Sequence, residues 1–305
     1  MTPNISKSEI LFLYEATYSI PNGDPFTGEQ RYDIETKSIL VSDVRIKRYI
    51  RDQIAQTDPN SIFVLHDPGE AKAEKSADPE SGAAARAKKL ANGDMTLEKF
   101  KELIDVRLFG GIVTAKKGAI TLTGPVQFAL LNPSLNKVDM RMHQNTSVFA
   151  SSTEKSRGAI GTTTVVPYAL LQIHGWINPF SALQTDLTET DIDTMFKALW
   201  NGINNVNTRS KSNQSSVLLL QVIYVNPTDK LYGLDRVLKL NRNEDKRDEQ
   251  LRSEEDYSLD LSALASTVLE SAKVKEVRYF TESDKLLKEL AAVRHSKLKL
   301  MPLSV

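Results

Sequence analysis

The chain has 305 residues, 40% of them hydrophobic and 26% charged, and its lack of cysteine excludes disulfides, thiolate metal sites and a cysteine nucleophile. Because 39 basic residues balance 39 acidic ones, the chain is not a general polycation, and any nucleic-acid site must come from local segregation of charge. No apolar stretch approaches the length of a membrane span and the first residues lack the apolar core of a signal peptide, which predicts a cytoplasmic protein with no membrane partner.

A strand followed by a tight turn is predicted near the start of the chain. Residues 9–19 are apolar and aromatic, as expected for a strand, and Pro-Asn-Gly-Asp-Pro at 21–25 ends it. Asn22 and Gly23 are first of all turn-forming residues. A role for them in holding a ligand is the second interpretation.

A helix with a basic face is predicted next. Ser42 or Asp43 can cap it, and isoleucines recur along one face at 46, 50 and 54. The remaining surface carries four cations that could grip phosphates: Arg45, Lys47, Arg48 and Arg51. The alternative is an ordinary solvated face, in which Asp52 pairs with Arg48 one helical turn away.

An insertion and a hairpin follow this helix. Residues 66–94 have no periodic apolar face, which predicts a mobile insertion. A short amphipathic helix is expected at 96–105. Strands at 112–115 and 119–131 then form a hairpin with a basic tip.

The middle of the chain is locally cationic. Between 107 and 164 two acidic residues stand against seven basic ones: Arg107, Lys116, Lys117, Lys137, Arg141, Lys155 and Arg157. Gly110 and Gly111 either let a nucleotide approach the backbone or end a helix, and the residues alone favour the helix end. By contrast, the acid-rich run 243–256 is predicted to be a solvated linker.

The second half of the predicted core begins with a strand at 138–149. A polar, basic loop at 150–161 and an extended segment at 162–177 follow it. Thr188 and Asp191 then begin the clearest amphipathic helix with a capping-box pattern. A nearly continuous apolar run at 216–225 predicts a strand that is covered on both faces.

Strand, helix, hairpin, helix and strand give the βαββαβ order of a ferredoxin-like fold, so the fold class is α+β. RNA-recognition-motif domains share this order, but their aromatic signature is absent, so any RNA would be held by its backbone rather than by stacking. We expect a single domain over 1–305 with a core at about 8–65, 106–149 and 186–230, an insertion at 66–105, a thumb at 150–164 and a C-terminal extension at 231–305.

Six stretches of the chain carry a family resemblance. They are the strand at 9–18, the PNGDP turn, the helix VSDVRIKRYIRD, DVRLFGG at 105–111, MHQNTS at 142–147 and GTTTVVPYA at 161–169. Together they resemble the backbone subunit of type I-B CRISPR surveillance complexes, the many-copy Cascade protein that coats guide RNA. The resemblance spans most of 8–226.

The resemblance implies a non-catalytic protein that polymerises head to tail along the crRNA guide. It implies a thumb that reaches the next copy, and it implies no cofactor. The partners would be the crRNA guide, target DNA paired with that guide, further copies of the chain, other Cascade subunits and a recruited helicase-nuclease. The implied RNA-binding residues are Asn22, Gly23, Arg45, Lys47, Arg48, Arg51, Arg107, Gly110, Gly111, Gln144, Asn145, Lys155, Arg157, Thr162 and Thr163.

CRISPR RNA-processing endoribonucleases are the enzyme alternative, because they too have ferredoxin-like folds. A general acid and base could come from His143 with Tyr168 or His174. The four histidines are scattered and show no metal-ligand spacing, so neither a metal site nor catalytic residues are predicted. A processing enzyme would turn over precursor RNA, whereas a coat subunit would bind RNA stoichiometrically.

Overall fold

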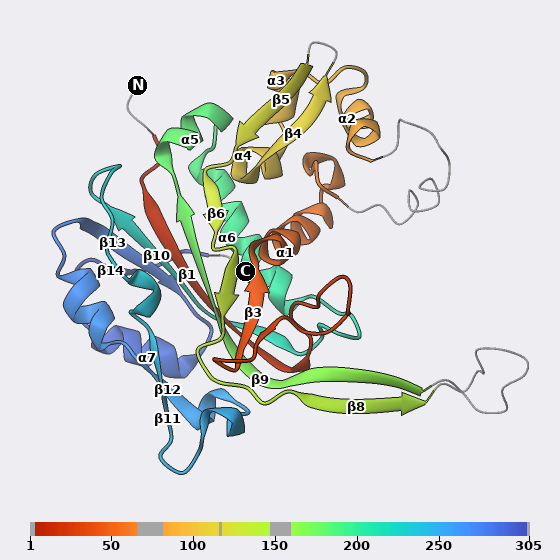
Figure 1. The fold of residues 1–305 in the computed structure, drawn as a ribbon. Helices are drawn as coiled ribbons and strands as arrows, with labels where there is room; N and C mark the ends of the chain where they lie inside the picture. The colour runs from red at the N-terminus through yellow and green to blue at the C-terminus, as the bar shows by residue number, and fades with distance from the viewer. Residues whose placement is uncertain (1–3, 66–81, 116–117, 147–159, 304–305) are drawn as a thin grey trace, which may run out of the picture.

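The computed structural model describes residues 4–65, 82–115, 118–146 and 160–303. A seven-stranded sheet lies at the centre of this described part, with the order β14-β13-β10-β1-β9-β6 and with β8 paired to β9 (Figure 1). Smaller sheets pair β11 with β12, β4 with β5, and β3 with both β2 and β7. The α+β fold class predicted from the sequence is confirmed.

The central strand contributes side chains to two hydrophobic cores. β1 (Ser8–Ser19) lies between β9 (Ile160–Ile177) and β10 (Gln214–Tyr224) and is antiparallel to both. Side chains alternate along a strand, so Phe12 and Leu13 enter opposite cores, and both are 0% exposed. The apolar run predicted to be covered on both faces is β10, and this prediction is confirmed by its residues in both cores.

Two helices cover the first face of the sheet. α1 (Asp43–Ala55) begins next to Ser42, and α6 (Glu189–Asn204) begins with the predicted capping box of Thr188 and Asp191. The two helices cross closely because Gly202 has no side chain. A Cβ at Gly202 would lie 2.6 Å from the carbonyl oxygen of Tyr49. The predicted stripe of α1 holds this contact, with Ile46 and Ile50 fully buried.

The C-terminal segment covers the second face. Its strands β13 (Val274–Phe280) and β14 (Leu298–Leu300) extend the sheet beyond β10, and α7 (Asp284–Ala292) packs beneath them. The acid-rich run 243–256 is not a solvated linker, because Leu251 is 0% exposed and belongs to this second core. Asp256 in the same run is also buried and accepts hydrogen bonds from Lys246 and from the Arg252 backbone N–H.

A small lobe, residues 82–115 and 118–123, stands beside α1, and several of its side chains, Phe100 among them, form a separate hydrophobic cluster with Phe63. It consists of α2 (Ala83–Ala91), α3 (Leu97–Lys101), α4 (Ile104–Phe109), β4 (Gly110–Ala115) and β5 (Gly118–Thr123). The expectation of an unstructured insertion through residue 94 is wrong for 83–91, where Arg86 donates to the carbonyl oxygens of Pro59 and Ile62. Residues 66–81 lie outside the described part.

An arm projects from the body of the molecule. It consists of β8 (Arg141–Thr146) paired with the first part of β9, from Ile160 to Val165 (Figure 1). Most of the predicted thumb, 150–164, lies outside the described residues. None of the described helices is long and apolar enough to cross a bilayer.

The remaining elements connect these parts. One helix among them, at 179–185, was not predicted. They are β2 (Tyr32–Asp33), β3 (Ser38–Ser42), η1 (Pro59–Ser61), β6 (Val126–Phe128), β7 (Leu131–Pro133), α5 (Pro179–Thr185), η3 (Leu234–Arg236), β11 (Lys239–Arg242), η4 (Asp248–Gln250), η5 (Glu254–Asp256), β12 (Tyr257–Asp260) and η6 (Leu264–Leu269).

Candidate nucleic-acid interface

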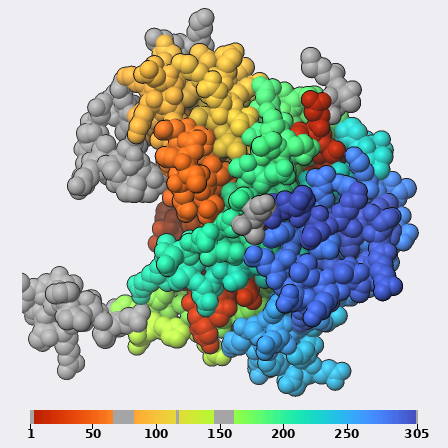
Figure 2. Space-filling view, turned by 180° about the vertical axis from the view of Figure 1, so that it is seen from behind, coloured from red at the N-terminus to blue at the C-terminus, as the bar shows by residue number. Residues whose placement is uncertain are grey.

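The candidate interface is the side of the molecule between α1 and the arm. Two loops, which we call the floor loops, lie side by side there: residues 20–31 after β1 and residues 205–213 before β10 (Figure 1). The backbone N–H of Ile20 donates to the carbonyl of Ser210 at 2.6 Å and joins them. In the space-filling view from behind, the silhouette of the molecule is indented between α1 and the arm (Figure 2).

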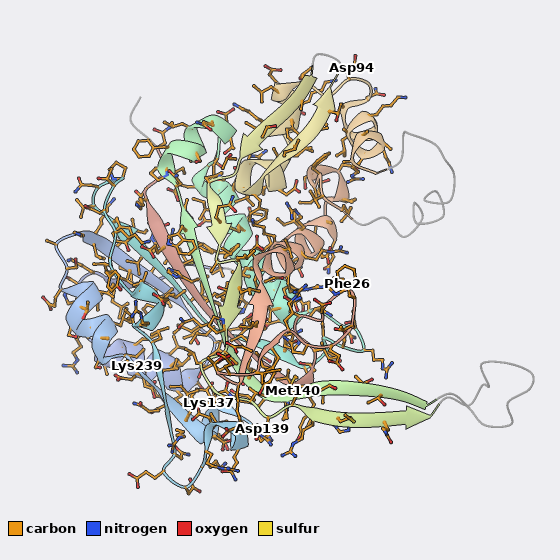
Figure 3. All side chains as sticks on the ribbon, in the orientation of Figure 1. Phe26, Asp94, Lys137, Asp139, Met140 and Lys239 are labelled. Atoms are coloured by element: carbon orange, nitrogen blue, oxygen red, sulfur yellow. The ribbon has the colours of Figure 1, made fainter. Side chains whose placement is uncertain are left out.

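The predicted turn residues brace the first floor loop against α1. The side-chain oxygen of Asn22 accepts from both the backbone N–H and the hydroxyl of Ser42, each at 2.7 Å, and the Asn22 backbone N–H donates to Gln30. Gly23 forms an isolated β-bridge with Gln30. Asn22 is buried and bonds within the protein, as expected of a residue that shapes the turn. At the tip of the loop, Phe26 is 95% exposed (Figure 3).

Two of the four α1 cations are held inside the protein. Lys47 bonds to Asp43 at 3.2 Å and to Gln127 at 2.9 Å. Arg51 bonds to the buried Asp105 at 2.9 Å. Both side chains are only 12% exposed and both lie over the ring of Phe109, so they join α1 to the lobe.

The other two α1 cations reach the surface. Arg48 pairs with Asp52 at 2.6 Å, which is the pairing considered from the sequence. Arg45 stacks on the ring of Tyr49, with 5.2 Å from its guanidinium carbon to the ring centroid, and no carboxylate of the described residues forms an ion pair with it. Arg45 is therefore the helix cation whose charge remains available.

Arg107 and the two glycines after it also have structural roles. The Arg107 guanidinium makes a two-bond contact with Asp191, at 2.9 and 2.7 Å, and donates to two backbone carbonyls. Gly110 has a φ of +73°, and a Cβ there would lie 2.2 Å from the Leu122 carbonyl oxygen. At Gly111 a Cβ would lie 2.9 Å from the ring of Phe100. The geometry therefore matches the helix-end interpretation of this pair.

The Arg107 contact changes the acidity of its partner. Burial opposes ionisation of Asp191, but hydrogen bonds from Arg107 and from Thr188 outweigh burial and hold the pKa of this carboxyl below its ordinary value. The same carboxylate accepts from the Thr188 backbone N–H and hydroxyl at the start of α6. Arg107 therefore pins α4 to the first turn of α6.

The remaining predicted residues lie on or beyond the arm. Gln144 pairs in register with Thr162, and both side chains are exposed. Thr163 pairs with His143 and is half-buried, and Asn145 pairs with Gly161 at the backbone. Lys155 and Arg157 lie outside the described residues.

The structure adds a cation that the sequence interpretation missed. Lys211 is half-buried in the second floor loop, where its amine donates to the Ser210 hydroxyl at 3.0 Å and no described carboxylate pairs with it. Burial, with a smaller contribution from the nearby Arg45 charge, lowers the pKa of Lys211. The signal in the sequence was Thr-Arg-Ser-Lys at 208–211, a polar loop with two cations and no acid.

Comparison of the chain with known proteins identifies its family. The family model described as CRISPR-associated protein Cas7 matches residues 6–262. The chain belongs to the Cas7 family. A curated CRISPR-associated protein Cas7 from Haloferax volcanii is 29% identical over 287 residues, which cover 87% of this chain and 83% of that relative.

This Cas7 chain has a fold similar to that of a chain in a solved structure. A chain of a structure titled "CRISPR RNA-guided surveillance complex" superposes with a TM-score of 0.53 and covers 92% of this chain and 90% of that one. The sequences are 14% identical. A likeness at that level concerns the fold.

The two histidines considered for an RNA-cleaving site, His143 and His174, are far apart. His143 lies opposite Thr163, and His174 lies eleven residues farther along β9, which is roughly 36 Å in an extended strand. Tyr168 is buried and bonds to Glu15 and Tyr257, and His174 bonds to the buried Glu9. Among the described residues no group of three or more potential ligands could hold a metal ion.

Proposed function

We propose that this Cas7 protein is a non-catalytic backbone subunit of a CRISPR surveillance complex that coats guide RNA. The observation that carries the proposal is a pair of cations, Arg45 on α1 and Lys211 in the second floor loop, which have no acidic partner among the described residues. Phosphate is the ligand that an uncompensated Arg and Lys pair would bind, and phosphate contacts serve every guide sequence equally.

The finer parts of the proposal concern assembly. Copies of the chain polymerise head to tail along the crRNA, with target DNA pairing to the exposed guide, other Cascade subunits at the ends and a recruited helicase-nuclease to cut the DNA. A head-to-tail contact whose rotation does not close gives a helical filament. A type I-B complex and a cytoplasmic location belong to the same proposal, as does a thumb at 150–164 that extends the β8–β9 arm toward the next copy.

We also propose that the core is ferredoxin-like and that the chain is one domain with insertions. The strand order β10-β1-β9-β6, antiparallel at each step, together with α1 and α6 on one face, supports this fold. The first part of the lobe, 82–105, belongs to the proposed insertion at 66–105, and β13 and β14 of the proposed C-terminal extension lengthen the sheet at its far edge.

A direct test is to load the purified protein with a long mixed-sequence RNA. We expect stoichiometric arrays that elute early in size-exclusion chromatography and appear as regular filaments in electron micrographs, with the RNA uncut. Turnover of a precursor RNA by a monomer or dimer would instead support the processing endoribonuclease. Substitution of His143 or His174 provides the control, because neither change should alter RNA length.

A further inference from the structure

Tyr18 has an unusual backbone conformation and an exposed ring. It lies near the end of β1 with a φ of +45°, in the left-handed region that bulky side chains rarely adopt, and its side chain is 57% exposed. Among the described residues no ring or cation stacks on the Tyr18 ring and no group bonds to its hydroxyl. Strained residues of this kind cluster at active sites, ligand clamps and switch regions.

The backbone around Tyr18 is tied to the second floor loop. Thr17 exchanges hydrogen bonds with Asn213: its N–H donates to the Asn213 carbonyl at 3.0 Å and its carbonyl accepts from the Asn213 side chain at 3.1 Å. On the other side, Ile20 donates to Ser210. Tyr18 is therefore held against the segment that contains Lys211.

Arg45 belongs to the same corner of the molecule. Its guanidinium lies over the ring of Tyr49, and the Tyr49 hydroxyl is 3.3 Å from the carbonyl oxygen of Pro21, three residues after Tyr18. The corner thus combines one uncovered aromatic ring with two cations that lack acidic partners. Aromatic rings beside unpaired cations are the composition of single-stranded nucleic-acid sites, where bases stack and phosphates bind.

We propose that Tyr18 stacks on a base of bound single-stranded RNA while Lys211 and Arg45 bind the adjoining phosphates. This inference rests on the proposed RNA-coating function and names a contact within it. It also revises the expectation that no aromatic residue stacks on the RNA. Stacking tolerates any base, because every base has a π face, so the contact suits a protein that must accept any guide.

The positive φ of Tyr18 allows a substitution that removes the ring without straining the backbone. Glycine adopts this conformation without strain, so Tyr18→Gly should fold at least as stably as the parent and should bind single-stranded RNA about tenfold more weakly. Tyr18→Phe should bind like the parent, because the hydroxyl is unbonded. Tyr18→Leu keeps an apolar side chain without the ring and should lose binding as Tyr18→Gly does.

A matched control is available at the opposite end of the sheet. Tyr232 is 92% exposed beside Arg236, and its loop is tied to Tyr224, whose neighbour Ile223 pairs with the first residue of β1. Tyr232→Ala should leave RNA affinity unchanged. It removes an exposed aromatic ring of the same kind from a place that the proposal does not use.

The readouts are RNA affinity and photo-cross-linking of a 4-thiouridine-substituted RNA. We expect the cross-linked peptide from the parent to contain Tyr18. Unchanged affinity in both Tyr18→Gly and Tyr18→Leu, loss in Tyr18→Gly alone, or cross-links that avoid Tyr18 on a bound RNA would each overturn the stacking contact. A parent protein that binds no RNA would overturn the proposed function itself.

Discussion

The cations that join the lobe to α1 and α6 differ in their surroundings from the two cations beside the floor loops. Lys47, Arg51 and Arg107 all bond to carboxylates of the described chain, whereas Arg45 and Lys211 pair with none. The residue types are the same in both regions. What separates a structural cation from one that is free for an external anion is therefore the presence of an acid beside it.

Burial makes the first region a structural joint. Asp105 has a 1% exposed side chain and accepts from Arg51 as well as from the backbone N–H groups of Phe63 and Val64. A buried carboxylate in such a position requires its partner, because an unpaired buried charge is strongly destabilising. These cations consequently have little freedom to contact RNA.

The largest expected effect is the loss of this joint. Arg51→Ala leaves Asp105 buried without its counter-ion and should lower the free energy of unfolding by about 3 kcal/mol, measured by urea denaturation. The matched control is Arg48→Ala on the same helix, which removes an exposed pair and should cost less than about 1 kcal/mol. Equal losses in the two variants would contradict the contrast between buried and exposed pairs.

A second, smaller effect concerns acid stability through Asp191. Its pKa is lowered in the folded protein, so the stabilisation that it provides is complete above its unfolded pKa near 3.8 and is lost as the pH falls through the lower folded value. Arg107→Ala removes the first lowering contact. The variant should therefore be less stable near neutral pH, and its thermal midpoint should fall less steeply than the parent's below about pH 4.

The smallest effect is expected at Lys211 and has the opposite sign. A lysine whose pKa is lowered by folding weakens the folded state while it is charged, and this cost is relieved as the pH rises toward 10.5. Because solvent still screens the half-buried amine, Lys211→Gln should raise stability at neutral pH by no more than about a few tenths of a kcal/mol, and it should lack the parent's alkaline rise. A loss of stability on substitution would show that Lys211 has a structural role.

The sequence predicted the framework of this contrast and missed its decisive contacts. β1, α1, α6 and β10 were predictable because their apolar patterns are long and regular. The partners of Arg51 and Arg107 lie 54 and 84 residues away in the chain, and no local pattern reveals such pairs. Helix periodicity alone therefore does not show which of the four cations on α1 meets an acid from a distant part of the chain.

Other misses have equally specific causes. α2 was not predicted because its buried side is made largely of alanines, Ala87 and Ala91, whose apolar signal is weak. The left-handed conformation of Tyr18 was not predictable, because glycine and asparagine are the residues that usually adopt it and a tyrosine stands at this position. The sequence pattern gave no prediction for most of the second floor loop, so Lys211 received no role.

The salt dependence of RNA binding tests the central claim most directly. In single-stranded complexes each phosphate contact contributes about 0.7 to the slope of log Kobs against log salt concentration. The double variant Arg45→Gln, Lys211→Gln should bind mixed-sequence RNA more weakly with a slope shallower by about 1.4, while Arg48→Gln leaves the slope nearly unchanged. An unaltered slope and affinity in the double variant would contradict the claim that the unpaired cations at the floor loops hold the RNA.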